Sequence, residues 1–366
     1  MAAKPLSVAH LIWSPEYALG LGGLEQLVVQ LSARSQARGI RASILAFGHD
    51  GPVRELARQH GLGFELLPGG GMSLPALLGI RRALDHAGAT VLHAHDLGPW
   101  LNAVAVRMLR PSTRVIATFH EQRRPSGHKL QAASLAALFS VALVACGELV
   151  RDEIRSWAPA GVHVPIIPNG VPIAAPGPEA RRNARAEMGV PGGAVAIGYL
   201  GGLRQIKGPD RLLQAFLDKF ADRADVHLYL VGTGPMEAEL RRAAEGHANV
   251  HLPGLIMNAS RLLPGFDIYA QTSLSEGRSL SMLEAMAAGL PTVAHRLGPV
   301  QEIHADGETA LLAELGDRAA LGAALQRLVN DPALRSRLGK AAQRRAQVHS
   351  IERMVDAYEA LYYELV

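Results

Sequence analysis

Short apolar runs alternate with amphipathic segments along the whole chain. In the first half, strands are expected at Leu6–Trp13, Ile40–Phe47, Val91–Ala94, Arg114–Phe119, Val141–Ala145 and Val164–Pro168. Helices are expected between them at Gly23–Arg38, Pro52–Gly61 and Glu148–Trp157. The strand segments are apolar and rich in β-branched residues, which is typical of parallel strands that are buried on both faces by helices.

The second half repeats this rhythm. Its expected strands are Val195–Leu200, Val226–Val231, Val250–Leu252, Ile268–Ala270, Thr292–Ala294 and Ala310–Leu312. Its expected helices are Asp210–Phe220, Glu237–Gly246, Ser279–Ala288 and Asp317–Val329. The pattern predicts an α/β fold with two Rossmann-like, doubly wound domains that face each other across a cleft.

The boundary between the domains is expected at the Pro-Asn-Gly-Val-Pro segment, Pro168–Pro172. An N-terminal, acceptor-side domain would then cover residues 1–170, and a C-terminal, donor domain residues 171–349. Residues 350–366 predict an amphipathic helix that packs back on the first domain. Ligands are expected at the C-terminal ends of the strands, where short loops meet helix N-termini.

Charge and cysteine content narrow the class of protein. The net charge is +4 in 366 residues, without a dense Lys/Arg block, so nucleic acid is not expected, whereas anionic substrates or an anionic membrane surface fit. The single cysteine, Cys146, excludes an internal disulfide, indicates a reducing compartment and is expected in the core. The longest uncharged run, Leu130–Gly147, is too short to span a membrane, and we expect no signal peptide before the first strand. We expect a cytoplasmic protein.

The strongest chemical signal lies between Ser275 and Met286. Glu276 is expected in a loop before a helix, and Glu284 two to three turns along that helix. The free N–H groups of residues 277–281 would point out of the helix N-terminus, where an anion binds well. Such a site suits a diphosphate with hydroxyl groups bound on either side, as in a nucleotide-sugar. The alternative is a surface turn with one buried glutamate.

One glycine turn follows the first expected strand of each domain. Gly22 and Gly23 open the first helix, where the backbone can approach a phosphate or a sugar, although the spacing is not that of a dinucleotide-binding turn. In the second domain, Arg204 and Lys207 follow such a turn and suit a phosphate, Arg204 as a fork and Lys207 as a point charge. A plain tight turn and a solvated pair of cations are the alternatives.

Histidines gather at strand ends in the first half. His93 and His95 alternate along one strand and therefore share a face, and His120 follows another strand at the C-terminal rim of the sheet. Metal binding by these three is an alternative that no thiolate or closely spaced carboxylates support. We expect no metal site, and we expect His120 to be the histidine with a catalytic role.

Together these segments resemble the retaining, GT-B-fold nucleotide-sugar glycosyltransferases of family 4. The resemblance runs nearly end to end, and the following motifs carry it: Gly22-Gly23-Leu24-Glu25, His93-Ala-His95, Thr118-Phe119-His120, Pro168-Asn169-Gly170-Val171, Lys207-Gly208, Gly232-Thr-Gly234, Glu276–Glu284 and Ala285–Pro291. The most specific part is the pair of glutamates, separated by seven residues, that leads into Gly-Leu-Pro.

The resemblance implies an enzyme that moves a hexosyl group from a nucleoside-diphosphate sugar to an acceptor hydroxyl, with retention of configuration. It assigns the donor diphosphate to Gly22, Gly23, Lys207 and the backbone of Ser279 and Leu280. Glu284 would bind the ribose, and Glu276 the donor sugar near its anomeric centre. His120 would hydrogen-bond the transferring sugar or position the acceptor. No cofactor or metal is implied, because cations and a helix N-terminus would stabilise the leaving diphosphate.

Two departures from the family pattern affect this assignment. The family usually has arginine where this chain has Gly202, and Arg204 is the candidate substitute. The family also often has Glu-Gly-Phe-Gly where this chain has Glu-Gly-Arg-Ser, so Arg278 becomes a candidate contact for an acidic sugar. We expect Arg278 to be solvated instead.

No motif identifies the acceptor. Candidate contacts are His95 and the loop cations Arg123 and Arg124, which suit a phosphate-bearing lipid or an acidic glycan, although solvation explains them equally well. A glycan, lipid-linked or small-molecule acceptor is expected, together with peripheral contact with the inner membrane surface. Two other hypotheses remain: a non-catalytic sugar-nucleotide-binding member of the family, and a nucleotide-sugar epimerase or hydrolase on the same fold.

Overall fold

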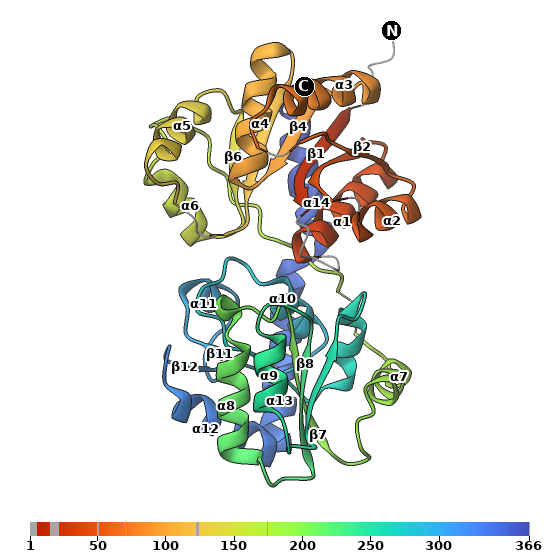
Figure 1. The fold of residues 1–366 in the computed structure, drawn as a ribbon, viewed down its shortest axis with the longest axis vertical. Helices are drawn as coiled ribbons and strands as arrows, with labels where there is room; N and C mark the ends of the chain where they lie inside the picture. The colour runs from red at the N-terminus through yellow and green to blue at the C-terminus, as the bar shows by residue number, and fades with distance from the viewer. Residues whose placement is uncertain are drawn as a thin grey trace. The chain divides into compact units, whose positions relative to one another are not determined.

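The computed structural model describes residues 6–14, 22–49, 51–69, 71–121, 124–173 and 175–365 (Figure 1). Its contacts divide the chain into two compact units. Unit 1 comprises Met1–Asn169 and Ile351–Val366, and unit 2 comprises Gly170–Ser350. Each unit is built on a six-stranded sheet, and every paired strand in both sheets runs parallel to its neighbour.

The sheet of unit 1 has the strand order β3-β2-β1-β4-β5-β6. Its strands are β1 (Ser7–Ser14), β2 (Arg41–Gly48), β3 (Gly63–Leu66), β4 (Val91–His95), β5 (Arg114–Phe119) and β6 (Ala142–Ala145). Its helices are α1 (Gly23–Ala37), α2 (Pro52–Gln59), α3 (Leu74–Ala87), α4 (Leu97–Leu109), α5 (His128–Ala137), α6 (Glu148–Arg155) and α14 (Ile351–Tyr363).

Alternation along these strands separates two cores. Odd-numbered residues of β1, such as Ala9 and Leu11, share one core with α3, α4, α5 and α6. On the opposite face, Ile12 packs with α1 and α2. The C-terminal helix α14 belongs to this unit, and Tyr358 and Tyr362 are buried where they hydrogen-bond side chains of β4 and β5.

Two strand assignments in unit 1 differ from the sequence analysis. The expected strand Val164–Pro168 is wrong, because the segment makes only an isolated bridge from Ile166 to Ala145. Proline at 165 and 168 removes two backbone donors and prevents a longer ladder. The short edge strand β3 was not predicted, because its sequence, Gly-Phe-Glu-Leu, has little of the apolar character of a buried strand.

The sheet of unit 2 has the strand order β12-β11-β10-β7-β8-β9. Its strands are β7 (Val195–Leu200), β8 (Val226–Val231), β9 (Val250–Gly254), β10 (Ile268–Gln271), β11 (Thr292–His295) and β12 (Ala310–Ala313). Its α-helices are α7 (Pro178–Met188), α8 (Pro209–Phe220), α9 (Glu237–Ala243), α10 (Leu280–Ala287), α11 (Gly298–Ile303), α12 (Arg318–Asn330) and α13 (Pro332–Ala346). Three short 3₁₀ helices are η1 (Gln205–Lys207), η2 (Ala259–Gly265) and η3 (Gln347–His349).

The sheet of unit 2 is also covered on both faces. Helices α8, α9 and α12 pack on the face that carries Ile197 and Leu228. Helices α10 and α13 pack with η2 on the face that carries Ala196 and Tyr269. The short strands are therefore enclosed on both sides, which explains their nearly continuous apolar sequences.

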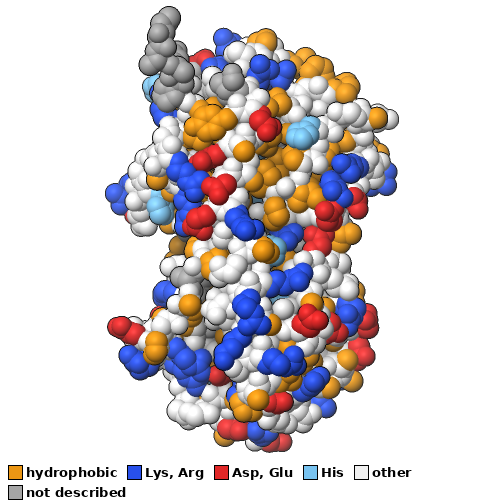
Figure 2. All heavy atoms as spheres, turned by 180° about the vertical axis from the view of Figure 1, so that it is seen from behind, with side chains coloured by type: hydrophobic (Ala, Val, Ile, Leu, Met, Phe, Trp, Pro, Cys, Tyr) orange, Lys and Arg blue, Asp and Glu red, His pale blue; other side chains and the backbone are white. Residues whose placement is uncertain are grey.

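Surface and burial complete the description. Cys146 is fully buried and belongs to the core of unit 1. Figure 2 shows one face, on which Lys and Arg side chains form a band across unit 2 with acidic side chains among them. Within the described residues, no helix combines the length and the apolar character that crossing a bilayer requires.

Candidate functional site

The strand order of unit 2 creates a switch point between β7 and β10. The chain adds β8 and β9 on one side of β7, and then returns to add β10 on the other side. The loops that leave the C-terminal ends of β7 and β10 therefore start beside each other. In open α/β sheets, ligands bind at this point.

The loop after β7 packs closely against the end of β10. Gly208 has φ +61°, and a Cβ at this position would lie 2.2 Å from the carbonyl oxygen of Thr272, so no other residue fits without strain. The Thr272 hydroxyl donates a hydrogen bond of 2.6 Å to the carbonyl of Gly208. This contact fixes the backbone next to Lys207, at the end of η1.

Lys207 and Glu276 form the centre of this site. The Lys207 ammonium donates to both carboxylate oxygens of Glu276, at 2.9 Å each. Gln271 Nε2 and Ser273 Oγ each donate to Oε1 of Glu276 at 2.5 Å. Glu276 is only 7% exposed, so these partners compensate for the burial of a charged group. The structure thus brings together a cation and an anion that the sequence placed in separate loops.

The N-terminus of α10 lies next to this pair. Ser279 is the N-cap, and its hydroxyl accepts a hydrogen bond from the Met282 backbone N–H. The same hydroxyl donates to Oε1 of Gln271, so Gln271 links the helix N-terminus to Glu276. Helix α10 begins at Leu280, and its first-turn N–H groups have no partner further back in the helix. A positive lysine and a helix N-terminus therefore lie at one strand end, which suits a phosphate.

Glu284 also lies on α10. It is the fifth residue of the helix, one turn beyond the N-terminus, so the expectation of two to three turns was wrong. The expected helix, Ser279–Ala288, begins only one residue before the observed start, so the error lay in the number of turns counted to Glu284. Burial raises the pKa of the Glu284 carboxyl to about 7.

Arg204 occupies the space above Gly202. A Cβ on Gly202 would lie 3.2 Å from Nε of Arg204. The guanidinium therefore lies where a side chain of residue 202 would begin. The loop after β7 thus carries a second cation close to the position where the family usually has arginine.

The expectation for Arg278 was wrong. Its guanidinium is only 8% exposed and pairs with Glu302 of α11 at 3.1 Å, so it is not a solvated loop cation. The partner was not visible in the sequence, because 24 residues separate the two side chains.

In unit 1, His120 follows β5 at the C-terminal edge of the sheet. Its Nε2 lies 3.1 Å from Nδ1 of His95, the last residue of β4. Its backbone N–H donates to the Asp96 carboxylate at 3.0 Å. Burial lowers the pKa of His120, whereas the charge of Asp96 and a hydrogen bond with Asn169 act in the opposite direction. His95 is fully enclosed and contacts His120 instead of the surface.

The other predicted residues of unit 1 are the glycines at the start of α1 and two arginines after His120. Gly22 is the N-cap of α1 and Gly23 is its first residue, and the Glu25 carboxylate folds back against Gly22. Arg124 is exposed, and Arg123 lies outside the described residues. The structure therefore adds a buried carboxylate, Glu25, to the glycine turn; burial raises its pKa.

A different trio of histidines is the one group of described residues with geometry close to that of a metal site. Ring nitrogens of His10, His93 and His95 lie within 4.8 Å of one another. However, both ring nitrogens of His93 are already hydrogen-bonded, one to Tyr362 and one to Thr118, at 2.7 Å each. A metal ion would have to break one of these buried bonds.

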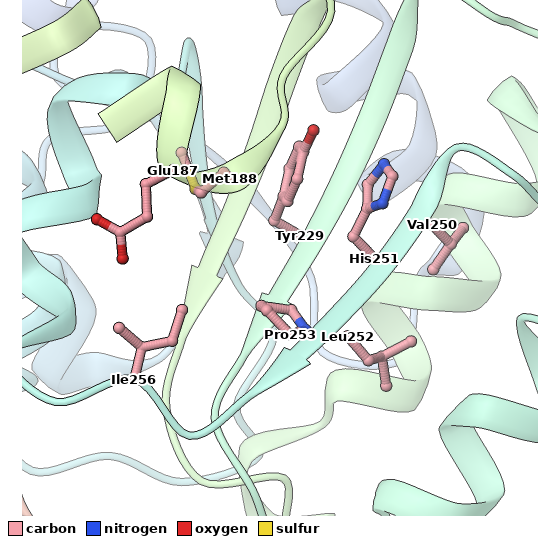
Figure 3. A pocket seen from close by; sticks show the side chains of 8 residues that line it. All are labelled: Glu187, Met188, Tyr229, Val250, His251, Leu252, Pro253 and Ile256. Carbon is pink, nitrogen blue, oxygen red and sulfur yellow. The ribbon is translucent and has the colours of Figure 1, made fainter. Parts of the chain in front are cut away.

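Unit 2 also has a shallow pocket of about 380 Å³ at the β9 edge of its sheet (Figure 3). The rings of Tyr229 and His251 stack in its wall, with centroids 4.4 Å apart, and Glu187 lies at the end of α7. None of the predicted site residues lines it, so this pocket is separate from the Lys207–Glu276 pair.

Two family models match consecutive parts of the chain. The model described as Glycosyltransferase Family 4 matches residues 21–175, and the one described as Glycosyl transferases group 1 matches residues 194–331. The chain belongs to glycosyltransferase family 4. The second match contains the complete Lys207–Glu284 region, so the family and the site geometry concern the same residues.

Relatives and solved structures agree with this membership. A D-inositol 3-phosphate glycosyltransferase from Arthrobacter is 32% identical over 194 residues, which cover 50% of this chain and 46% of that protein. The chain thus spans about half the length of that relative. A phosphatidyl-myo-inositol mannosyltransferase from Mycobacterium leprae is 29% identical over 336 residues, 86% of each chain. The structure of Anabaena HepE with UDP and glucose has a TM-score of 0.83 at 19% identity, with 98% and 100% coverage, and shows that the fold is GT-B.

Three residues of these two candidate sites were not predicted from the sequence. Gln271 ends an apolar strand and gave no signal of its own, although it contacts both Glu276 and Ser279. Asp96 follows β4 and its sequence context suggested no role, yet its carboxylate accepts a hydrogen bond from the backbone N–H of His120. His10 is an isolated polar residue in a buried strand. Its one signal is that it lies opposite His93 in the register of the paired strands β1 and β4.

Glu284 gives the first prediction. If its carboxylate accepts hydrogen bonds from the ribose, affinity for a nucleoside diphosphate should fall roughly tenfold between pH 8 and pH 6, as a group of pKa about 7 becomes protonated. Calorimetric titration of wild type and Glu284→Gln measures this. The variant shares the titration of the diphosphate itself but should lack the extra pH dependence. Identical pH profiles for the two proteins would contradict the ribose assignment.

The same substitution has an effect on stability. Because the folded pKa of Glu284 is raised, the native state binds more protons than the unfolded state between about pH 4.5 and 7, so stability falls as the pH rises through that window. At pH 8, the free energy of unfolding of Glu284→Gln should therefore exceed that of wild type by about 1–3 kcal/mol, and the variant should unfold at a higher temperature.

Proposed function

We propose that this chain transfers a hexosyl group from a nucleoside-diphosphate sugar to an acceptor hydroxyl, with retention of anomeric configuration. The observation that carries the proposal is the ion pair between the partly exposed Lys207 and the buried Glu276 at the switch point of unit 2, beside the N-terminus of α10. One solved structure with the same fold supports the donor class, since it is a complex with UDP and glucose.

Different residues of α10 would bind different parts of the nucleotide-sugar donor. The backbone N–H groups at Ser279 and Leu280 would bind the diphosphate together with Lys207 and Arg204. Glu284 lies four residues beyond Leu280, a rise of about 6 Å along the helix axis. That separation suits a ribose attached to the diphosphate. The helix thus presents hydrogen-bond donors at its N-terminus and a hydrogen-bond acceptor, the Glu284 carboxylate, on its side.

The ion pair has a clear role in the reaction. Without donor, Glu276 holds Lys207; with donor, the ammonium would be shared between the carboxylate and a phosphate oxygen. Positive charge develops on the anomeric carbon in glycosyl transfer, and the buried Glu276 carboxylate would stabilise it. Lys207 would stabilise the negative charge on the leaving diphosphate at the same time.

Lys207→Ala should weaken binding of the nucleoside diphosphate roughly 10- to 150-fold, because a charge-assisted hydrogen bond contributes about 1.5–3 kcal/mol. Arg204→Ala should cost a similar factor, because its guanidinium lies above Gly202. Calorimetric titration with the nucleoside diphosphate that stabilises the protein most in a thermal screen measures both.

A compensating variant controls for misfolding. Gly202→Arg combined with Arg204→Ala restores a guanidinium in the same loop and should recover most of the lost affinity. Unchanged affinity in Lys207→Ala would remove the basis for placing the diphosphate here.

We also propose that the transfer needs no metal ion or other cofactor, because Lys207, Arg204 and the α10 N-terminus supply positive potential at the diphosphate. Turnover should therefore be the same after dialysis against EDTA as before it. Loss of turnover on EDTA treatment, with recovery on addition of Mn²⁺ or Mg²⁺, would refute this.

The acceptor is a hydroxyl of a glycan, a lipid-linked sugar or a small molecule. The family relatives have inositol phosphate, phosphatidyl-inositol and malate in their names, so their acceptors differ widely. Incubation of the protein and its preferred donor with one representative of each class, followed by mass spectrometry, tests this. If only the free sugar forms with every acceptor, the protein is a hydrolase, which is the alternative on this fold.

A further inference from the structure

Three histidines of unit 1 form a continuous row that ends at His120. Nδ1 of His10 lies 3.2 Å from Nε2 of His95, and Nδ1 of His95 lies 3.1 Å from Nε2 of His120. The three residues come from β1, β4 and the end of β5, which are neighbouring strands. The row therefore crosses the switch point of this sheet, between β1 and β4.

We infer that this row is a relay of neutral imidazoles that fixes the proton of His120 on Nδ1, and that His10 and His95 are positioning residues for the transfer. The inference rests on the proposed function only for the consequence in catalysis. The geometry of the row itself belongs to the free protein.

The first step of the argument is that the row is uncharged. His10 and His95 are completely buried, and burial lowers the pKa of His10 to about 3 and that of His95 well below its usual value. A neutral imidazole has one N–H donor and one acceptor nitrogen. Once one ring has chosen its tautomer, each neighbour in the row must follow in the same direction.

The second step is the direction. Nε2 of His10 is buried and has no hydrogen-bond partner in the described part of the chain. If donation ran from His120 to His10, Nε2 of His10 would carry an N–H group without an acceptor. If donation runs from His10 to His120, the same nitrogen carries only a lone pair. Orphaned buried N–H groups are the rarer of the two. Donation therefore runs from His10 through His95 to Nε2 of His120.

The third step is the tautomer that this direction leaves on His120. Nε2 of His120 accepts from Nδ1–H of His95, so the neutral ring carries its own proton on Nδ1. All three histidines then carry their proton on Nδ1.

The backbone fixes the ring as well as its proton. The Asp96 carboxylate accepts a hydrogen bond from the backbone N–H of His120. The backbone of Asp96 has φ 67° and ψ 174°, a conformation that residues other than glycine rarely adopt. Strained residues of this kind are concentrated at functional sites. His120 is thus held at its backbone by Asp96 and at its ring by His95.

A neighbouring histidine offers a matched control. His93 is as buried as His95, and their ring centroids lie 4.3 Å apart. Its two nitrogens bond only Tyr362 and Thr118, so it does not belong to the row. His95→Phe and His93→Phe each remove one buried imidazole from the same core, and only the first interrupts the row.

Long-range ¹H–¹⁵N spectra of the free protein with ¹⁵N-labelled histidine report the tautomer of each ring. We expect Nδ1–H for His10, His95 and His120 in wild type. In His95→Phe, His120 should shift toward Nε2–H, and kcat should fall roughly 2- to 10-fold with unchanged affinity for the nucleoside diphosphate. In His93→Phe, His120 should keep the Nδ1–H tautomer.

Three results would overturn the inference: Nε2–H on His120 in wild type, the same tautomer shift in both variants, or a shift in His95→Phe without a change in kcat. If His95→Phe does not fold, the wild-type tautomers decide the question alone. The spectra need no substrate, so they stand even if the protein proves not to be a transferase.

Discussion

Glu276→Gln is expected to lower kcat and kcat/KM together by roughly 10²–10³, with affinity for the nucleoside diphosphate close to that of wild type. Glutamine keeps the volume of the side chain and removes its charge. That charge matters mainly in the transition state, when the anomeric carbon becomes positive. Steady-state kinetics and calorimetric titration measure the two effects separately.

Glutamine is preferable to alanine at this position. Alanine would leave Lys207, Gln271 and Ser273 without their shared acceptor, and a loss of stability would obscure the kinetic effect. Glu187→Gln is a suitable control, because its carboxylate also pairs with an arginine of unit 2, Arg261 at 2.6 Å. The control should retain wild-type turnover. If Glu276→Gln does so too, the proposed role of this carboxylate is wrong.

His120→Ala is the second substitution with a large expected effect. The family resemblance implies that its side chain hydrogen-bonds the transferring sugar or positions the acceptor, so kcat should fall by roughly 10²–10³. Affinity for the nucleoside diphosphate should change little, because the charged side chains that are proposed to bind the diphosphate and the ribose belong to unit 2. The same pair of measurements, kinetics and calorimetry, separates these effects.

His60→Ala controls for the loss of a histidine from unit 1. His60 is exposed at the end of α2, and its removal should leave kcat unchanged. If His120→Ala weakens nucleoside diphosphate binding by as much as it lowers kcat/KM, the side chain contributes to ground-state binding and not to the transfer step.

Much of the fold could be predicted because its sheets are parallel and buried. Strands such as β8, Val-His-Leu-Tyr-Leu-Val, are enclosed by helices on both faces and leave a continuous apolar signal. The edge strand β3 leaves no such signal, and the prolines at 165 and 168 reduce an apolar run to a single bridge. Edge strands and proline-containing runs depend on their neighbours in space.

The candidate site was predictable where a residue type has a local function. A lysine next to a glycine turn and a glutamate before a helix suggest phosphate and sugar binding wherever they lie in space. Partners distant in sequence were not predictable: Arg278 pairs with Glu302, and His10 reaches His95 across 85 positions. Strand register and the packing of loops and helices decide such contacts, and both become visible only in the folded chain.

The anomeric configuration of the product tests the central proposal most directly. Proton NMR of the glycoside formed by wild type from a donor of known configuration gives this configuration. The account predicts a transferred sugar with the donor's own anomeric configuration. A product with inverted configuration would contradict it.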